Sequence, residues 1–214
     1  MKLILARHGN TFDDGQIPTW VGSKNDLPLV EKGKAQAEAL ADYLVKNSIK
    51  PDAVYCGPLK RTKEYAQIIC ENAKLNLEPI IDERLNEIDY GEWSGLTNKE
   101  ISEKFGDDVL CAWNDFSIWP EKEKGNWGTS KQKLLSNVNS FVEGLSQKYS
   151  LVPASNDKTI LAVSSNGVLR HFGLIFGNKT NAKVKPGNIC ITEITNKKLE
   201  ILSWDISSAE LKKT

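Results

Sequence analysis

Hydrophobic and polar positions change their spacing repeatedly along this chain. Four short apolar runs are typical of buried strands: residues 2–6, 53–56, 77–81 and 159–164. Apolar side chains at helical spacing occupy four other segments: residues 31–47, 60–71, 134–145 and 166–176. Two further runs, 189–194 and 199–204, flank Asn196-Lys197 and predict a hairpin. The alternation of strands and helices predicts an α/β fold, a three-layer α/β/α sandwich with a mostly parallel central sheet.

Capping signals mark the expected start of two helices. Thr97 and Glu100 have the spacing of a capping box, ahead of a short helix. Thr129 and Gln132 have the same spacing, ahead of the third helical segment. We expect both helices to begin at these threonines.

Residues 106–128 interrupt the alternation. The stretch combines Trp113, Trp119 and Trp127 with charged residues and glycines. We expect an irregular cap over one end of the sheet, either a small surface core or a lid over a substrate. The chain has no internal repeat and no low-complexity linker, so we expect a single domain over residues 1–214.

Composition and charge narrow the possible functions. The 214 residues are 40% hydrophobic and 26% charged, as in ordinary globular proteins. Lys+Arg and Asp+Glu are 28 each, and this net charge of +0 argues against a nucleic-acid partner. No apolar run is long enough to span a bilayer, and the apolar start ends at Arg7, too early for a secretory signal. Four scattered cysteines predict reduced thiols in a cytoplasmic protein, and two histidines leave little material for a metal site.

Reactive side chains follow the predicted parallel strands. Arg7 and His8 come directly after the first strand, and Arg61 opens the helix after the second. Glu87 follows the third strand and Ser165 the fourth. Because open α/β sheets bind ligands beyond the carboxyl ends of their strands, we expect these side chains to converge.

The chemistry of these side chains suits phosphoryl transfer. The guanidinium groups of Arg7 and Arg61 can hold a phosphoryl dianion through paired, charge-assisted hydrogen bonds. The neutral imidazole of His8 is a competent nucleophile toward phosphorus. A protonated Glu87 can supply the proton that the leaving alkoxide needs.

Five blocks of the sequence resemble the histidine phosphatases, the phosphoglycerate mutase-like superfamily. Residues 7–11, Arg-His-Gly-Asn-Thr, resemble its Arg-His-Gly-x-Thr signature. Four further blocks follow in the family's order: residues 27–37, 58–62, 85–96 and 163–170. The resemblance covers nearly the whole chain and implies a phosphoglycerate mutase-like fold.

The resemblance implies a role for each matching residue. His8 is implied to be phosphorylated during turnover, Arg7 and Arg61 to bind the phosphoryl group, and Glu87 to donate the proton. Two loop residues are implied to line the site and contact the phosphate: Asn10 and Thr11. A phosphatase of this type is implied to need no metal and no organic cofactor.

The chain departs from the family where the second histidine of a Ser-His-Gly-Gly segment is expected. The aligned pair here is Ser165-Asn166, which we expect to bind phosphate through the hydroxyl and the amide without a charge. A charged hydrogen bond contributes roughly 1.5–3 kcal/mol, so its loss slows the reaction about ten- to a hundred-fold. We expect His171 to lie on a helix face rather than replace the missing group. Val30, where the family commonly has Thr, is expected to leave its helix without a side-chain cap.

These features predict a phosphatase that hydrolyses a phosphomonoester through a phosphohistidine on His8. One alternative is a mutase-like phosphotransferase, which the lack of an obvious long insertion disfavours. The other is a catalytically weakened protein that binds a phosphorylated ligand, which Ser165 suggests. We expect a small phosphorylated metabolite as partner rather than a phosphoprotein, and neither nucleic acid nor membrane. The sequence identifies no substrate and leaves open whether the chain is a dimer.

Overall fold

A mixed sheet lies at the centre of the molecule. The computed structural model describes residues 1–150, 158–177, 181–195 and 198–207. Within this part of the chain the sheet has the order β3-β2-β4-β1-β5-β6. Its strands are β1 (Lys2–Arg7), β2 (Ala53–Cys56), β3 (Ile80–Ile81), β4 (Thr159–Ser164), β5 (Ile189–Thr195) and β6 (Lys198–Ile206). The first four strands pair in parallel, and β5 and β6 add an antiparallel edge.

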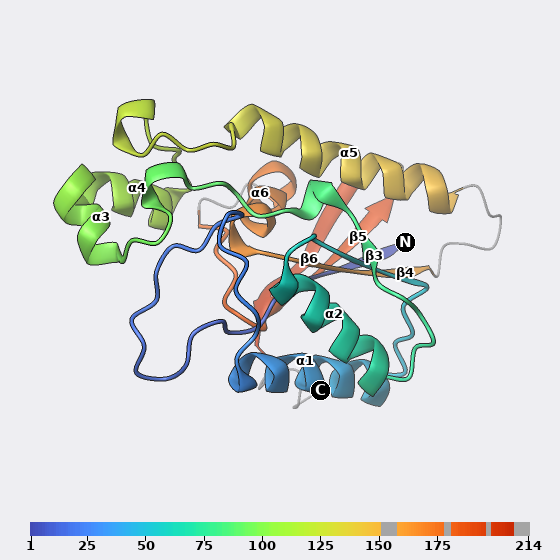
Figure 1. The fold of residues 1–214 in the computed structure, drawn as a ribbon. Coiled ribbons are helices and arrows are strands. Elements are labelled where there is room, and N and C mark those ends of the chain that lie inside the picture. The colour runs from blue at the N-terminus through green and yellow to red at the C-terminus, as the bar shows by residue number, and fades with distance from the viewer. Residues whose placement is uncertain (151–157, 178–180, 196–197, 208–214) are drawn as a thin grey trace.

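Helices cover both faces of this sheet, as predicted (Figure 1). One face carries α1 (Glu31–Lys46) and α2 (Lys60–Asn72), and the other carries α5 (Lys131–Ser150) and α6 (Asn166–Gly177). The alternation of side chains along each strand explains the two cores. In β1, Leu3 and Leu5 pack into the core under α5 and α6, whereas Ile4 and Ala6 pack into the core under α1 and α2.

Two short helices lie beyond one end of the sheet (Figure 1): α3 (Asn98–Phe105) and α4 (Asp107–Phe116). The expectation of an irregular stretch over residues 106–128 is therefore wrong for its first half. Leu110 and Trp113 lie one turn apart in α4 and are buried. Asp107 and Asp108 lie in its first turn, where the helix dipole favours a negative charge. Three single 3-10 turns complete the described helices: η1 (Glu83–Leu85), η2 (Gly91–Trp93) and η3 (Lys122–Lys124).

Local predictions differ in their outcome. The capping box at Thr97 is present, and Val30 caps α1 without a side-chain bond. The box expected at Thr129 is wrong, because that hydroxyl accepts the backbone N–H of Asp89 at 2.9 Å. Ser130 takes the capping position instead and accepts from Lys133 at 3.2 Å. β5 and β6 form the predicted antiparallel pair, and its turn, Asn196-Lys197, lies outside the described residues.

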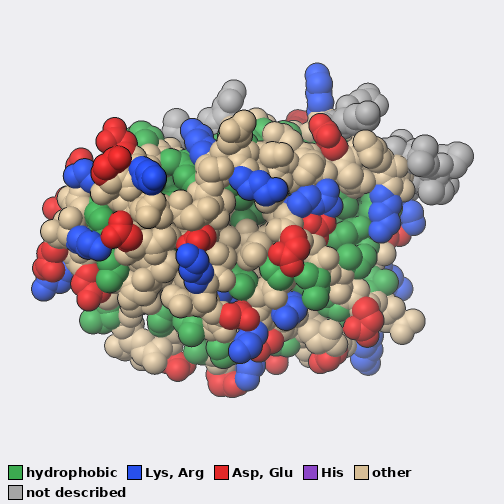
Figure 2. Space-filling view, turned by 45° about the horizontal axis from the view of Figure 1, so that its top comes forward, with side chains coloured by type: hydrophobic (Ala, Val, Ile, Leu, Met, Phe, Trp, Pro, Cys, Tyr) green, Lys and Arg blue, Asp and Glu red, His purple; other side chains and the backbone are tan. Residues whose placement is uncertain are grey.

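A membrane span requires a certain length and apolar character of its helix. None of the described helices is long and apolar enough to cross a bilayer. Figure 2 shows acidic and basic side chains interspersed over the face in view, in keeping with the balanced charge of the sequence.

Candidate active site

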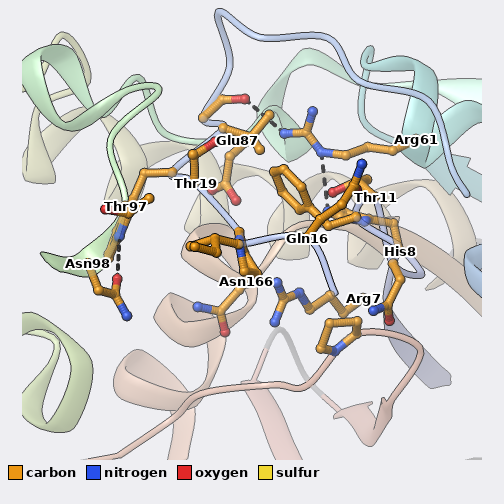
Figure 3. Close-up of a pocket in the computed structure, with 18 of the residues that line it drawn as sticks. Arg7, His8, Thr11, Gln16, Thr19, Arg61, Glu87, Thr97, Asn98 and Asn166 are labelled. Atoms are coloured by element: carbon orange, nitrogen blue, oxygen red, sulfur yellow. Dashed lines mark hydrogen bonds between the residues drawn. The ribbon is translucent and has the colours of Figure 1, made fainter. Parts of the chain in front are cut away.

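A cavity of about 710 Å³ opens where β1 ends, near the amino ends of α2 and α6 (Figure 3). Seven of the residues that the sequence singled out line it: Arg7, His8, Asn10, Thr11, Arg61, Glu87 and Asn166. Ser165 does not line the cavity and is fully buried. The parallel strands thus bring together side chains up to 159 positions apart, as their order predicted.

His8 is held in one orientation. Its backbone N–H donates to the carbonyl of Ser164 on the neighbouring strand at 3.0 Å. Its Nδ1 lies 2.7 Å from the carbonyl oxygen of Gly9, which only accepts, so we assign the proton to Nδ1. Nε2 then carries a lone pair, and Nε of Arg61 donates to it at 3.2 Å. Burial and the charges of Arg61 and Arg7 lower the pKa of His8 well below 6.5, which keeps the ring neutral.

The loop after His8 is held against the start of α1. Gly9 and Gly33 meet so closely that a Cβ on either would collide with backbone of the other segment. The backbone N–H of Val30 donates to the carbonyl of Asn10 at 3.1 Å, and the N–H of Asn10 donates to Gln36 at 2.8 Å. These contacts fix the floor of the cavity beneath the imidazole.

The two guanidinium groups are oriented by backbone carbonyls rather than by carboxylates. Arg61 donates to the carbonyls of Gly22 at 2.8 Å and Asn25 at 3.1 Å. Arg7 donates to the carbonyl of Val184 at 2.7 Å, and its Nε is buried without a partner. Burial is the main cause that lowers the pKa of Arg7, to about 10, so the group remains charged near neutral pH.

Glu87 is half-buried and lines the same cavity as these cations. Burial raises the pKa of its carboxyl, although the backbone N–H groups of Ile88 and Gly167 and the charges of Arg61 and Arg7 oppose that rise. Among the described residues, no ion pair involves Arg7, Arg61 or Glu87. With Glu87 protonated, the cavity therefore holds buried positive charge that an anion can neutralise.

Ser165 and Asn166 play different parts in the structure. The Ser165 hydroxyl is fully buried and has no hydrogen-bond partner. The Asn166 side-chain oxygen accepts the backbone N–H of Val184 at 2.9 Å, which leaves the amide NH₂ for the cavity. Figure 3 shows Asn166 and Arg7 side by side on the same wall.

Trp113, which the sequence analysis placed in a small surface core or a lid, contributes an aromatic wall of the cavity. Three further residues of the cavity were missed: Tyr90, which adds a second aromatic wall, and Asn114 and Lys183, which contribute polar groups. Tyr90 lies in the same sequence block as Glu87, three positions after it. This closeness in sequence could have identified Tyr90 as a residue of the site. Nothing in the sequence indicated that Lys183 belongs to the site, because its place depends on the hydrogen bond between Arg7 and the next residue, Val184.

His171 lies outside the cavity. Its Nδ1 lies 2.7 Å from the carbonyl of Gly167, and its Nε2 accepts from Trp119 at 3.1 Å. Both ring nitrogens are engaged, so His171 offers no free nitrogen to the cavity. Within the described part of the chain, no cluster of His, Cys, Asp or Glu could hold a metal ion.

Curated relatives match part of the chain. Phosphoserine phosphatase 1 of Hydrogenobacter thermophilus is 36% identical over 152 residues, 70% of this chain and 66% of that protein. The 2,3-bisphosphoglycerate-dependent phosphoglycerate mutase of Corynebacterium efficiens is 36% identical over 115 residues, 52% of this chain and 44% of that protein. The chain thus matches between about two fifths and two thirds of the length of these relatives.

Solved structures match the fold over nearly its whole length. The mycobacterial glucosyl-3-phosphoglycerate phosphatase in complex with VO3 has a TM-score of 0.78 at 21% identity, covering 96% of this chain and 99% of that one. The alpha-ribazole phosphatase of Shigella flexneri has a TM-score of 0.71 at 23% identity, with 96% of both chains covered. The sequence model of the histidine phosphatase superfamily, branch 1, matches residues 3–207. This chain is therefore a member of branch 1 of the histidine phosphatase superfamily.

Proposed function

We propose that this protein hydrolyses a phosphomonoester through a phosphohistidine intermediate on His8. One observation carries the proposal: the unprotonated Nε2 of His8 lies 3.2 Å from the Arg61 guanidinium, in a cavity that Glu87 also lines. A lone pair, an anion-binding cation and a raised carboxyl pKa are the three groups that the reaction requires.

The first half-reaction transfers the phosphoryl group to the protein. Nε2 of His8 attacks phosphorus, and the ester P–O bond breaks. Glu87 gives its proton to the departing alkoxide and becomes a carboxylate. The Gly9 carbonyl, 2.7 Å from Nδ1, stabilises the positive charge that develops on the imidazole. Arg7 and Arg61 bind the phosphoryl oxygens, for which Arg61 exchanges its bond to Nε2 for one to oxygen.

The second half-reaction restores the protein. The Glu87 carboxylate takes a proton from water as that water attacks phosphorus, and the P–N bond breaks. Phosphate leaves, His8 recovers its neutral ring, and Glu87 is protonated again. Asn10, Thr11 and Asn166 line the space around the phosphoryl group and supply uncharged contacts.

The cavity and the cysteines support a proposed partner and a proposed location for the protein. The cavity suits a small phosphorylated metabolite, with aromatic and amide side chains around the rest of the molecule. The four cysteines, Cys56, Cys70, Cys111 and Cys190, form no disulfide, which suits the reducing cytoplasm.

Two other functions remain as rivals. A mutase activity is favoured by the identity to phosphoglycerate mutases. A weakened protein that only binds phospho-ligands is favoured by the buried, uncharged Ser165. A binder has no need of a nucleophile and an acid with a raised pKa in one cavity, which supports the enzyme.

The test compares wild type with His8→Ala on p-nitrophenyl phosphate, with Lys185→Met, an exposed lysine outside the cavity, as the matched control. We expect turnover by wild type and by the control, background rates for His8→Ala, and acid-labile ³²P labelling that requires His8. Equal background rates in wild type and His8→Ala, with vanadate still bound, would establish the binder. Isomerisation of 3-phosphoglycerate faster than phosphate release would establish the mutase.

A further inference from the structure

One cation of the cavity has no part in the proposed reaction. Lys183 lines the cavity, and no ion pair among the described residues involves it. The residue as a whole is exposed, but its amine is partly buried. Burial, followed by the charges of Arg170 and Arg7, lowers the pKa of Lys183, against weaker opposition from Asp115 and Asp205. The amine is a further cation of the cavity, close enough to Arg7 for the two charges to interact.

The backbone next to Lys183 fixes its place on the wall. The carbonyl of Val184 accepts from Arg7 at 2.7 Å, and the N–H of Val184 donates to Asn166 at 2.9 Å. The backbone of the residue after Lys183 is thus bonded to both Arg7 and Asn166, and the side chain of Lys183 lines the same cavity as these two residues. Arg7, Asn166 and Lys183 therefore all offer donors to the cavity, and of these three only Lys183 has no role in the proposed phosphoryl transfer.

The far wall is different. Figure 3 shows Thr19, Thr97 and Asn98 at the end of the cavity away from His8, where they offer hydroxyl and amide groups. Lys99 also lines this end, and its amine lies 3.8 Å from the carboxylate of Glu103. Of the two lysines that line the cavity, Lys99 is therefore paired with a carboxylate, and Lys183 has no ion pair among the described residues.

We propose that Lys183, with one of the two N–H donors of the Asn166 amide, binds a carboxylate of the substrate next to the phosphoryl group. A single ammonium and one amide match the single charge and two oxygens of a carboxylate. A second phosphate has more charge and more acceptor oxygens than these two groups can satisfy. The proposal rests on the proposed function and narrows it to phosphomonoesters of carboxylic acids.

The test uses two substrates that differ only in the carboxylate, O-phosphoserine and O-phosphoethanolamine. We expect wild type to prefer phosphoserine in kcat/KM, and Lys183→Met to lower this preference about tenfold. Lys183→Arg keeps the charge and should retain most of the preference. Lys185→Met, two positions away, exposed and outside the cavity, is the matched control and should retain all of it.

The outcomes separate the subsite from the reaction. A preference unchanged in Lys183→Met, or lowered equally in Lys185→Met, overturns the subsite while leaving the phosphatase intact. If wild type hydrolyses no ester, the proposed function is wrong, and the subsite is decided by calorimetry with 3-phosphoglycerate and glycerol 3-phosphate. Tighter binding of 3-phosphoglycerate that Lys183→Met abolishes supports the subsite, and equal binding of the two compounds overturns it.

Discussion

The protonation states of His8 and Glu87 depend on what surrounds each side chain. The Gly9 carbonyl selects the tautomer of His8, and burial beside two arginines keeps the ring neutral. The sequence places these residues in one site, but neither the tautomer nor the desolvation follows from spacing. The same limit applies to Asn166, whose orientation is set by the N–H of Val184, 18 positions away.

The pH profile of kcat/KM should reflect these two shifts. Catalysis requires a neutral His8 and a protonated Glu87. The pKa of His8 is lowered, so the acid limb should lie well below pH 6.5. The pKa of Glu87 is raised, so the alkaline limb should lie above 4.5. A buffer series at constant ionic strength measures both limbs. Glu87→Gln should remove the alkaline limb, and a limb that persists in this variant contradicts the role of Glu87.

Ser165→Ala tests the unpartnered hydroxyl. The hydroxyl is buried without a hydrogen bond, so its removal should leave the free energy of unfolding unchanged or raise it by up to about 1 kcal/mol. If it donates to the phosphoryl group, kcat should fall roughly tenfold. Denaturant unfolding and steady-state kinetics on the same preparations give both values. A large loss of stability with unchanged kcat would show that the hydroxyl has a structural partner instead.

The spacing of apolar residues predicted most strands and helices correctly, but it failed where other contacts decide the structure. The strands at 2–7 and 159–164 match because both of their faces are buried, and the pairing of β5 with β6 matches because two apolar runs lie close together in the sequence. The run at 77–81 pairs only through Ile80–Ile81, at an exposed edge where little apolar area is gained. Helix α4 was missed, and spacing also does not reveal the contacts that a side chain of α6 makes with its carboxyl end.

Arg170 makes those contacts. Its guanidinium is buried and donates to the carbonyls of Trp113 and Asn114 and to the hydroxyl of Ser117, at the carboxyl end of α4. It also lies over the Trp113 ring, 4.8 Å from the centroid. The Trp113 carbonyl also accepts the N–H of Ser117, and the Asn114 carbonyl lies in the last turn of α4, so Arg170 caps this helix end from α6. The cap holds Trp113 and Asn114 in the wall of the cavity.

Arg170→Met should therefore loosen α4. We expect the free energy of unfolding to fall by about 2–3 kcal/mol, from lost charged hydrogen bonds. KM should rise more than kcat falls, because Trp113 and Asn114 line the cavity and take no part in proton transfer. Urea unfolding and steady-state kinetics measure the two effects. Arg170→Lys restores the charge and should recover part of both, whereas an unchanged KM would show that α4 does not shape the cavity.

Over the whole molecule, the charge of the cavity differs from the charge of the surface. Its formal net charge is +0, and Figure 2 shows both signs mixed over the face in view. The cavity, by contrast, concentrates the guanidinium groups of Arg7 and Arg61 without ion-paired carboxylates. Attraction of a phosphorylated substrate therefore comes from this local field, and sequence-wide charge did not predict it.

Burial of the two histidines should make stability depend on pH. Burial lowers the pKa of His171 to about 4, and His8 is shifted in the same direction. Between this value and the ordinary 6.5, the unfolded chain binds a proton that the folded His171 does not, so stability falls as pH falls. Glu87, with its raised pKa, acts in the opposite sense above 4.5, where the folded state holds the extra proton.

His171→Gln isolates one contribution to this dependence. Between pH 7.5 and pH 5, His171 should account for about 2 kcal/mol of the loss in the free energy of unfolding. Glutamine can still accept from Trp119 but does not titrate, so the variant should lose that much less over the same interval. Denaturant unfolding at the two pH values measures the difference. His8 and Glu87 are common to both proteins, so their contributions cancel in the comparison. An identical pH dependence would mean that His171 is protonated in the folded state and that the Trp119 bond opens to admit the proton.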